Sequence, residues 1–437
     1  MKIAVIGAGP AGLALALMAA RKLPRAEISL FDARAADHDV SADPRTLALA
    51  LGSVQLLQKL DGWPDDAAQP ITSVHVSQAP PTLNIGGLAA EVTLDAATEN
   101  VPMLGAVLSY GALVSRLQMA WQHRVGLEPR RLHSRFGQPV KQVRNLTGLA
   151  ASGAGEGDGD GDGVEVDAGI AERFDLAVVA EGGVFSDQAR KAITHDYQQQ
   201  AWVGNVILSA PAAGLPGAGA SAPAAVLASS GGLAGLAIER FTRHGPLALL
   251  PLRASPSAPA LTPGQRRAAM VWCVPSDDDP VAELDELQRR TVLNTLLPAL
   301  AGQVEAVSPL KCFALGLNAE RTLVDGAIVR IGNAAQTLHP VAGQGLNLGL
   351  RDAVSLVHGL QHAPGTSGAG IADVLRRLEW ARAPDRWGMI AATDFLARSF
   401  TWGWPGLPAA RGLGLAALQR LGPVKSALAR QMMFGRR

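Results

Sequence analysis

The chain has 437 residues, of which 48% are hydrophobic and 18% charged, and this composition excludes a disordered or fibrous protein. Its 39 basic and 38 acidic side chains leave a net charge of +1, which excludes a protein that binds nucleic acid by neutralising phosphates. Cys273 and Cys312 are the only cysteines and lack metal-ligand spacing, so we expect no disulfide framework, no metal site and a reducing compartment.

The first residues could be mistaken for a targeting segment. Ile3 to Ala20 carry no charge, as in a signal peptide or a short membrane span. Three glycines and a proline in a fixed pattern fit neither, so we interpret the segment as a buried strand, a tight turn and a helix from Leu13 to Leu23. Any contact with a membrane is then expected to be peripheral.

Short apolar runs along the chain predict a doubly wound parallel sheet in an α/β protein. The candidate strands are Lys2–Ile6, Glu27–Asp32, Phe174–Ala180 and Gly326–Gly332. Because these runs lie far apart in the sequence, we expect another domain to be inserted between them.

The expected insert consists of β-rich segments suited to an antiparallel sheet. These are Ile71–Gln78, Leu83–Leu94, Trp202–Ser209, Ala234–Phe241, Leu247–Leu252 and Ala269–Val274. Loops rich in Ala, Gly, Pro and Ser are expected at Ala210–Ala224 and Ala254–Pro263. The tract Gly153–Gly163 alternates Gly and Asp but lacks the bidentate glutamate of a calcium loop, so we interpret it as a flexible hairpin tip.

A glycine-rich turn follows the first strand and opens the first helix. Gly7 permits the tight turn, Gly9 lets the backbone approach a pyrophosphate, and Gly12 allows close helix–strand packing; Ala11 lies inside this fingerprint. Asp32 ends the second strand, where a carboxylate can accept hydrogen bonds from ribose hydroxyls. The pattern predicts binding of a dinucleotide; the alternative is a glycine turn without a ligand.

A second glycine loop follows the strand at Gly326–Gly332. Asn333 stands at the strand's end, where a polar side chain can reach a ribityl chain. Gly343 and Gly345 leave unpaired backbone N–H groups at a helix start, aimed where negative charge on a reduced isoalloxazine would develop. We interpret the loop as a flavin cradle; by composition alone it could be a helix cap after a tight loop.

The motifs together resemble one family. The fingerprint, the segment from Asp43 to Leu49, the segment Glu239–Leu252 and the segment Gly332–Asn347 are similar to those of the flavin hydroxylases of ubiquinone biosynthesis, and within them to the 2-octaprenyl-6-methoxyphenol hydroxylases. The resemblance implies a class A FAD monooxygenase with the p-hydroxybenzoate hydroxylase fold, a Rossmann-type FAD domain with an inserted antiparallel-sheet substrate domain. FAD would stay bound, NADH or NADPH would reduce it, and O₂ would form a C4a-hydroperoxyflavin that hydroxylates a polyprenylated phenol.

The resemblance also implies roles for individual residues. Those expected at the ADP half of FAD are Gly7, Gly9, Ala11, Gly12 and Asp32, with Arg45 by the flavin and pyrophosphate. Asn333 would lie by the ribityl chain, and Gly343, Gln344, Gly345 and Asn347 would flank the isoalloxazine. The expected organisation is FAD-binding parts at 1–70, 101–190 and 316–394, substrate-domain parts at 71–100 and 191–315, and a helical tail at 395–437.

Two positions carry open alternatives. The family's Asp-Gly motif is replaced by Glu181-Gly182-Gly183, so Glu181 either contacts FAD, displaced by one residue, or merely caps a strand end. His339 adjoins the flavin loop and could act as a base toward the phenol, but a histidine before a proline in a tight loop is at least as often structural. Catalysis is expected to centre on the flavin, with no certain catalytic side chain.

The segment from Phe395 to Arg437 has seven basic residues and no acidic one, with aromatic residues interleaved. This composition suits a membrane interface or a groove of another quinone-biosynthesis protein; the alternative is a tail packed on the FAD domain. We expect a cytoplasmic protein, peripheral at the inner face of the membrane if the tail docks there. Two other functions stay open: hydroxylation of another ring position or an unrelated phenol, and a non-catalytic flavin-binding scaffold.

Overall fold

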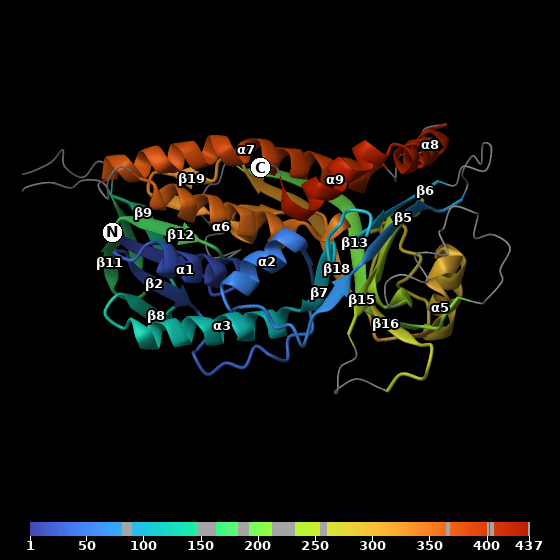
Figure 1. Cartoon of the computed structure of the whole chain (residues 1–437), viewed down its shortest axis with the longest axis horizontal. Coiled ribbons are helices and arrows are strands. Elements are labelled where there is room, and N and C mark those ends of the chain that lie inside the picture. Colours follow the sequence, from blue (N-terminus) through green and yellow to red (C-terminus); the bar gives the residue numbers. More distant parts are fainter. Residues whose placement is uncertain are drawn as a thin grey trace, which may run out of the picture.

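A computed structural model gives the fold (Figure 1). It describes residues 1–80, 90–146, 163–181, 192–211, 232–253, 260–363, 368–399, 402 and 406–435. One half of the molecule is built on a mostly parallel sheet covered by helices, and the other half on a large, mostly antiparallel sheet (Figure 1).

The first sheet has six strands in the order β19-β20-β12-β1-β2-β8. Their bounds are β1 Lys2–Ile6, β2 Glu27–Asp32, β8 Leu132–Phe136, β12 Leu176–Val179, β19 Val324–Asp325 and β20 Ile328–Arg330. All pairs are parallel except β19–β20. Helices α1 (Pro10–Lys22), α3 (Tyr110–Leu127) and α6 (Gly345–Gln361) share one apolar core with strands of this sheet. The mostly parallel sheet predicted from four apolar runs is therefore confirmed, but it is not doubly wound, because these helices pack on one face and short β-strands pack on the other.

A three-stranded antiparallel sheet packs on the six-stranded one. It contains β9 (Gln142–Asn145), β10 (Val164–Asp167) and β11 (Ala171–Phe174). Phe31 of β2 and Phe174 of β11 meet edge to face in the core between the two sheets. The Gly153–Gly163 tract joins β9 to β10, but apart from Gly163 it lies outside the described residues.

The second large sheet runs in the order β21-β18-β13-β16-β15-β14-β5-β6, with β17 beside β13. The strands are β5 Ser73–Gln78, β6 Glu91–Asp95, β13 Ala192–Leu208, β14 Leu236–Phe241, β15 Pro246–Leu252, β16 Arg266–Pro275, β17 Val304–Val307, β18 Lys311–Glu320 and β21 Gln336–Thr337. Only β14–β5 is parallel. Helix α5 (Glu286–Leu296) covers one face, and a capping box of Asp285 and Gln288 starts it. Each expected segment of the insert supplies a strand; the part of Leu83–Leu94 before Ala90 and most of the two loops lie outside the described residues.

The sequence did not predict strands β8 to β11, β17 and β21, nor the two features that follow. A small sheet of β3 (Thr46–Ala50), β7 (Gly105–Ser109) and β4 (Gln69–Ile71), followed from β3 by helix α2 (Leu51–Lys59), lies between the two halves. Strand β18 runs through the expected domain boundary at 315/316 and pairs along β13. Short 3₁₀ turns occupy Gly232–Gly235, Ala299–Ala301, Gly332–Ala334 and Val341–Gly343.

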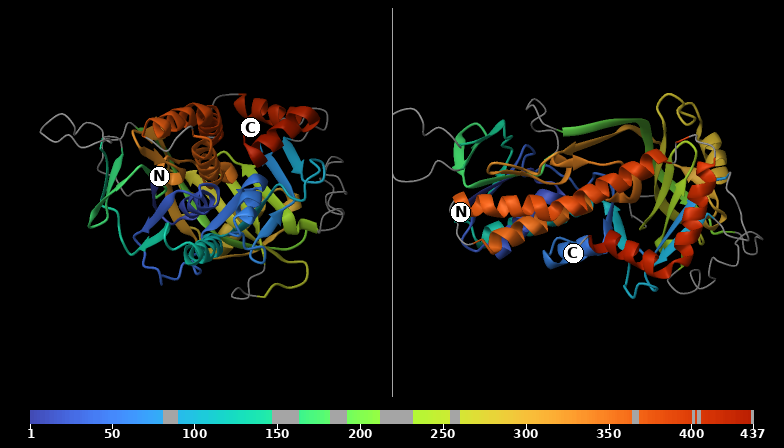
Figure 2. Two further views of the ribbon diagram at one scale, coloured as in Figure 1. Left: turned by 60° about the vertical axis from the view of Figure 1, so that its left-hand side comes forward. Right: turned by 90° about the horizontal axis from the view of Figure 1, so that it is seen from above.

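The chain ends in three helices on one face: α7 (Gly368–Ser399), α8 (Leu407–Arg420) and α9 (Gly422–Phe434). Helix α7 spans both halves, and α8 and α9 turn back along the same face (Figure 2). Ala429 and Met433 of α9 pack with Leu51 of α2 and Leu94 of β6. Among the described helices, none has both the length and the apolar character needed to cross a bilayer.

Candidate flavin-binding site

The turn between β1 and α1 has the tight shape that its glycines suggested. Gly7 adopts a left-handed φ of 101°, and a Cβ added there would lie 2.6 Å from Glu181 Cβ. A Cβ on Gly12 would lie 1.9 Å from the Gly7 carbonyl oxygen, so helix and turn touch. Gly9 is the N-cap of α1 and gives no side-chain cap, and the first N–H groups of the helix therefore remain available to an anion.

Asp32 is buried at the end of β2, and its carboxylate is engaged by its own chain. Oδ2 accepts from the Ala8 N–H at 2.7 Å and from Arg34 Nη2 at 2.9 Å, and Oδ1 accepts from the Arg34 N–H at 2.8 Å and Nε at 2.9 Å. Burial pushes the pKa of Asp32 up, but the hydrogen bonds from Arg34 and Ala8 outweigh it and hold the pKa below its usual value. Four donors fill the usual capacity of a carboxylate, so a ribose hydroxyl can bind only where Arg34 moves aside.

Glu181 lies beside this turn, directly after β12. Burial, and then the nearby carboxylate of Asp32, raise the pKa of the Glu181 side chain. Glu181 therefore lies against the dinucleotide turn, and its contact with FAD stays a prediction. The remainder of the altered motif, Gly182 onward to Lys191, lies outside the described residues.

The second glycine loop connects β20 to α6. Asn333 is exposed in the 3₁₀ turn Gly332–Ala334 that follows β20, and its contact with a ribityl chain stays a prediction. Gly343 has a left-handed φ of 58°, and a Cβ added to it would lie 3.2 Å from Ala48 Cβ. A Cβ at Gly345 would meet no atom within 4 Å, and Gln344, the N-cap of α6, gives no side-chain cap. The N–H groups at the start of α6 therefore have no side-chain cap, which suits an anionic flavin ring. The Gly343 N–H was also expected to be unpaired, but it donates to the Pro340 carbonyl at 3.0 Å.

The two glycine turns are held together by the packing of α1 against α6. Ala11 is buried, and its Cβ lies 3.4 Å from the position of a Cβ added at Gly332. Gly349 of α6 reaches the same spot, since its added Cβ would be 2.6 Å from Gly332 Cα. Ala11, expected at the cofactor, thus packs between the turns.

Arg45 lies between the two turns. Its guanidinium binds the Asp43 carboxylate at 2.7–3.0 Å and stacks on Tyr110, with Cζ 4.1 Å from the ring centroid. Tyr110 Oη in turn is the atom nearest to a Cβ added at Gly9, at 3.6 Å. The Arg45 guanidinium therefore lies beside the space between the first glycine turn and Gly343. A pyrophosphate bound in this space would need such a cation.

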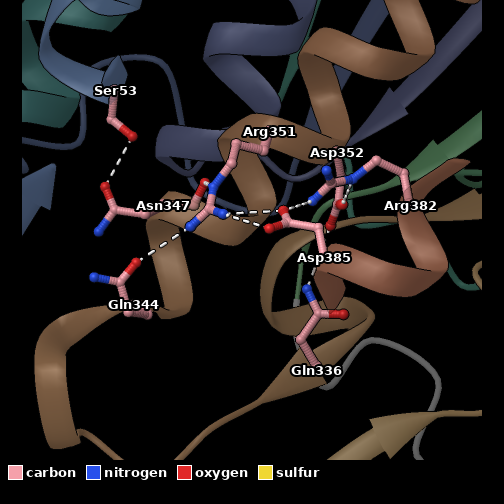
Figure 3. Close-up of polar contacts among 8 residues, drawn as sticks. All are labelled: Ser53, Gln336, Gln344, Asn347, Arg351, Asp352, Arg382 and Asp385. Carbon is pink, nitrogen blue, oxygen red and sulfur yellow. Dashed lines mark hydrogen bonds and ion pairs between the residues drawn. The ribbon is translucent and has the colours of Figure 1, made fainter. Parts of the chain in front are cut away.

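Asn347 was expected to flank the flavin ring, but both polar atoms of its side chain are hydrogen-bonded to other residues of the protein. Its Nδ2 donates to the carbonyls of Ala48 at 3.1 Å and Gly343 at 3.0 Å. Its Oδ1 accepts from the Ala50 N–H and from Ser53 Oγ, both at 2.8 Å (Figure 3). Asn347 therefore supports the glycine loop from behind by tying it to β3 and α2.

His339 is 2% exposed and has both ring nitrogens engaged. Nδ1 accepts from the Val341 N–H at 3.2 Å, which leaves the proton on Nε2, 3.1 Å from Gln199 Oε1. Burial lowers the pKa of His339 to about 4, with a smaller opposing influence from Asp394. A neutral, fully bonded imidazole favours the structural role over that of a base.

Sequence reasoning missed the charged network behind this loop (Figure 3). Arg351 of α6 donates to Gln344 Oε1 at 3.2 Å and binds both oxygens of Asp385 on α7 at 2.9 Å. Arg382 of α7 joins Asp385 to Asp352 through contacts of 2.8 and 2.7 Å. Arg351 and Asp352 follow the motif segment Gly332–Asn347 closely, but nothing in the sequence indicated partners 30 or more positions away.

On its other side, the loop meets the second large sheet. Val341 packs with Phe241 of β14, Val76 of β5 and Leu396 of α7 in a small apolar cluster. The sheet therefore offers an apolar wall next to Gly343. Among the described residues, no cluster of His, Cys, Asp and Glu side chains is placed to hold a metal ion.

Parts of this sequence are similar to a known domain family and to known proteins. Residues 229–392 match the FAD binding domain family. The chain is 35% identical to the ubiquinone hydroxylase UbiL of Rhodospirillum rubrum over 46% of this chain and 44% of that protein. It is 30% identical to the 3-demethoxyubiquinol 3-hydroxylase of Escherichia coli over 43% of this chain and 45% of that protein. The matches thus span less than half of the length of these relatives.

Solved structures share the fold across almost the whole chain. The p-nitrophenol 4-monooxygenase PnpA of Pseudomonas putida has a TM-score of 0.65 at 14% identity and covers 100% of this chain and 98% of its own. HpxO of Klebsiella pneumoniae, complexed with FAD and uric acid, has a TM-score of 0.61 at 16% identity, with coverage of 98% and 97%. The expected α/β fold, the FAD-binding domain and the resemblance to flavin hydroxylases of ubiquinone biosynthesis are confirmed.

Proposed function

We propose that this FAD-binding protein is an NAD(P)H-driven aromatic hydroxylase that acts on a polyprenylated phenol in ubiquinone biosynthesis. The observation that carries the proposal is the pair of glycine turns fixed side by side, each followed by an open helix N-terminus. An elongated cofactor with a phosphate part and an anionic ring part suits such a pair. The relatives in quinone biosynthesis support the substrate class.

The residues present fit FAD at most of the expected positions. Gly7, Gly9 and the start of α1 would hold the pyrophosphate, with Arg45 beside it. Asn333 would hold the ribityl chain, and the N–H groups at Gly345 would hold the ring's polar edge. When bound, FAD supplies the electron transfer and oxygen chemistry, which side chains cannot provide.

The protein's own part is then to place the phenol and keep water away from the ring. The apolar cluster of Val341, Phe241 and Val76 gives a water-poor wall beside the loop. The partial positive charge at the start of α6 favours a negatively charged ring after reduction. His339 is neutral and bonded on both sides, so no proton transfer is assigned to it.

Peripheral contact with a membrane is part of the proposal, because the substrate carries a lipid tail. Leu421, Val424 and Leu428 are exposed at the start and along one side of α9. Arg420 and Lys425 accompany them, and no acidic residue follows Phe395 in the sequence. An apolar stripe bordered by cations suits the surface of an anionic bilayer.

The test is anaerobic reduction of the FAD-loaded protein by NADH or NADPH, with and without a polyprenylated phenol, followed by addition of O₂. We expect the phenol to accelerate reduction and to gain one oxygen atom, detected by mass spectrometry with ¹⁸O₂. Hydroxylation of a different phenol, or at another ring carbon, would change the substrate assignment and leave the chemistry intact.

A flavin-binding scaffold is the second candidate. The observation that favours it is the replacement of the family's Asp-Gly by Glu181-Gly182-Gly183, where the resemblance implies a contact with FAD and the pyridine nucleotide. A scaffold would bind FAD but show no phenol-stimulated oxidation of NADH or NADPH, and no hydroxylated product in the same experiment.

A further inference from the structure

Behind the flavin loop, Arg351 lies between two parts of the chain that are distant in sequence. On one side its Nη2 donates to Gln344 Oε1 at 3.2 Å, and its Nε contacts the Asn347 carbonyl at 3.3 Å. On the other side the C-terminal end of α9 touches it, since a Cβ added at Gly435 would lie 2.5 Å from Arg351 Nη1. One partly buried guanidinium thus contacts both the loop and the end of the C-terminal helix.

Helix α9 reaches the same loop by a second route. A Cβ added at Gly52, in the first turn of α2, would lie 2.9 Å from the Met433 carbonyl oxygen and 3.2 Å from Phe434 Cδ1. The next residue, Ser53, holds Asn347, which in turn holds the Gly343 carbonyl. The end of α9 is therefore packed against Arg351 and against the turn that carries Ser53, the two groups that hold the loop.

The ion pairs make Arg351 a rigid support rather than a mobile side chain. Both of its Nη1 contacts to Asp385 are 2.9 Å, and Asp385 is also bound by Arg382. The side chains of Asp385 and Arg382 are 2% and 6% exposed, so water screens these charges weakly. Beside them lies a cavity of about 180 Å³, lined among others by Ser53, Arg351, Met433 and Phe434.

We propose that Arg351 is a positioning residue for the flavin ring, and that docking of α9 is what keeps Arg351 and the loop from Gly343 to Asn347 in place. The C-terminal helix then contributes to the cofactor site through Arg351 and the support of the loop. The proposal rests on FAD binding at this loop but not on hydroxylation.

The first test uses Arg351→Met and Arg351→Lys in the full chain, reconstituted with FAD. Loss of a charged hydrogen bond to Gln344 should weaken FAD binding by about tenfold and shift the flavin's absorption bands and reduction potential. Arg351→Lys should restore part of each, because it keeps the charge but not the two-pronged geometry. Arg376→Met, on the exposed side of α7, is the matched control and should change neither.

A structural role alone would lower the melting temperature and leave the spectrum and potential of the bound flavin unchanged. That result in Arg351→Met would overturn the proposal. Because this variant could fold poorly, Gln344→Met provides a second measurement that leaves the pair of Arg351 and Asp385 in place. It should reproduce the spectral shift, and the two changes together should add little to either one.

The role of α9 is tested by Phe434→Ala and by a chain ending at Leu421. Both should give the spectral shift of Arg351→Met with FAD still bound, and neither should shift the flavin further in an Arg351→Met background. Normal flavin spectra in both would overturn the role assigned to α9. Complete absence of FAD from the wild-type chain would instead contradict the proposed function itself.

Discussion

Gly349 of α6 touches Gly332 at the end of β20, so closely that a Cβ on Gly349 would come within 2.6 Å of Gly332 Cα. This contact fixes α6 against the strand and therefore fixes the loop between them. The neighbouring atom belongs to the backbone, which cannot rotate away as a flexible side chain would.

We expect Gly349→Ala to lower the free energy of unfolding by about 1–3 kcal/mol, the usual cost of overpacking a core, and to weaken FAD binding in the folded fraction. Denaturant unfolding and flavin titration measure the two effects. Gly414→Ala in α8 is the control, since its Cβ would meet nothing within 4 Å. Alanine there should stabilise the helix by roughly 0.5–1 kcal/mol. Equal stability of the two variants would contradict the close contact at Gly332.

Gly9→Leu should give a folded but colourless protein. Gly9 has φ −77° and ψ −179°, which any residue adopts, and its added Cβ approaches only Tyr110 Oη, at 3.6 Å. The leucine side chain would therefore enter the space proposed for the pyrophosphate without unfolding the turn. Flavin content after purification and the melting temperature measure the outcome. Gly126→Leu, at an open position in α3, should stay yellow.

The pH dependence of stability tests the role given to His339. Its pKa is about 4 in the folded chain and 6.5 when unperturbed, so the unfolded state takes up its proton first as the pH falls. Its contribution, at most about 3 kcal/mol, is fully present above pH 6.5 and is lost as the pH approaches 4. Unfolding by denaturant at several pH values should show this loss in the wild type.

His339→Asn keeps an acceptor for the Val341 N–H but has no titrating group, so its stability should depend less on pH in this window. His75, whose pKa burial likewise lowers to about 4, titrates in both proteins and cancels in the comparison. If wild type and variant lose the same stability between pH 7 and pH 5, the buried neutral histidine is the wrong account.

Two substitutions that introduce glutamate at the start of α9 test contact with a membrane. Leu421→Glu with Val424→Glu should reduce co-sedimentation with anionic vesicles by about tenfold or more, since burial of one leucine is worth roughly 1.5–3 kcal/mol. Leu287→Glu is the control, because Leu287 is 65% exposed but lies on another helix, α5. Unchanged binding of the first variant would leave α9 as a packing element only.

Local patterns predicted most of the two large sheets. The apolar run Lys2–Ile6 and the alternating segment Ser73–Gln78 both form strands. A strand buried on both faces is apolar at successive positions and one buried on a single face alternates, so neighbouring residues are enough to predict either. The small sheet of β3, β4 and β7 was not predicted. Its strands are short, and their pairing joins residues such as Leu47 and Leu108 that lie far apart in the chain.

Three glycines of the site were predictable for the same reason, since Gly7 and Gly343 adopt left-handed φ and Gly12 lies against the Gly7 carbonyl. The roles of Asn347 and Arg351 were not. Asn347 stands in a motif beside the glycines, yet its partners are Ala48, Ala50 and Ser53, some 300 positions earlier. A side chain's partners follow from the folded arrangement, and residue type alone does not distinguish a group that faces a ligand from one that supports a loop.

Strand β13 runs through the second large sheet as a single element of 17 residues. Its first residues pair with β18, and its last residues pair with β16 and β17. On its other edge β18 pairs with β21, which belongs to the segment between β20 and α6. The segment that carries the second glycine loop is therefore hydrogen-bonded to the second large sheet, and a rotation of the two large sheets against each other would have to break the contacts of Gln336 and Thr337 with β18.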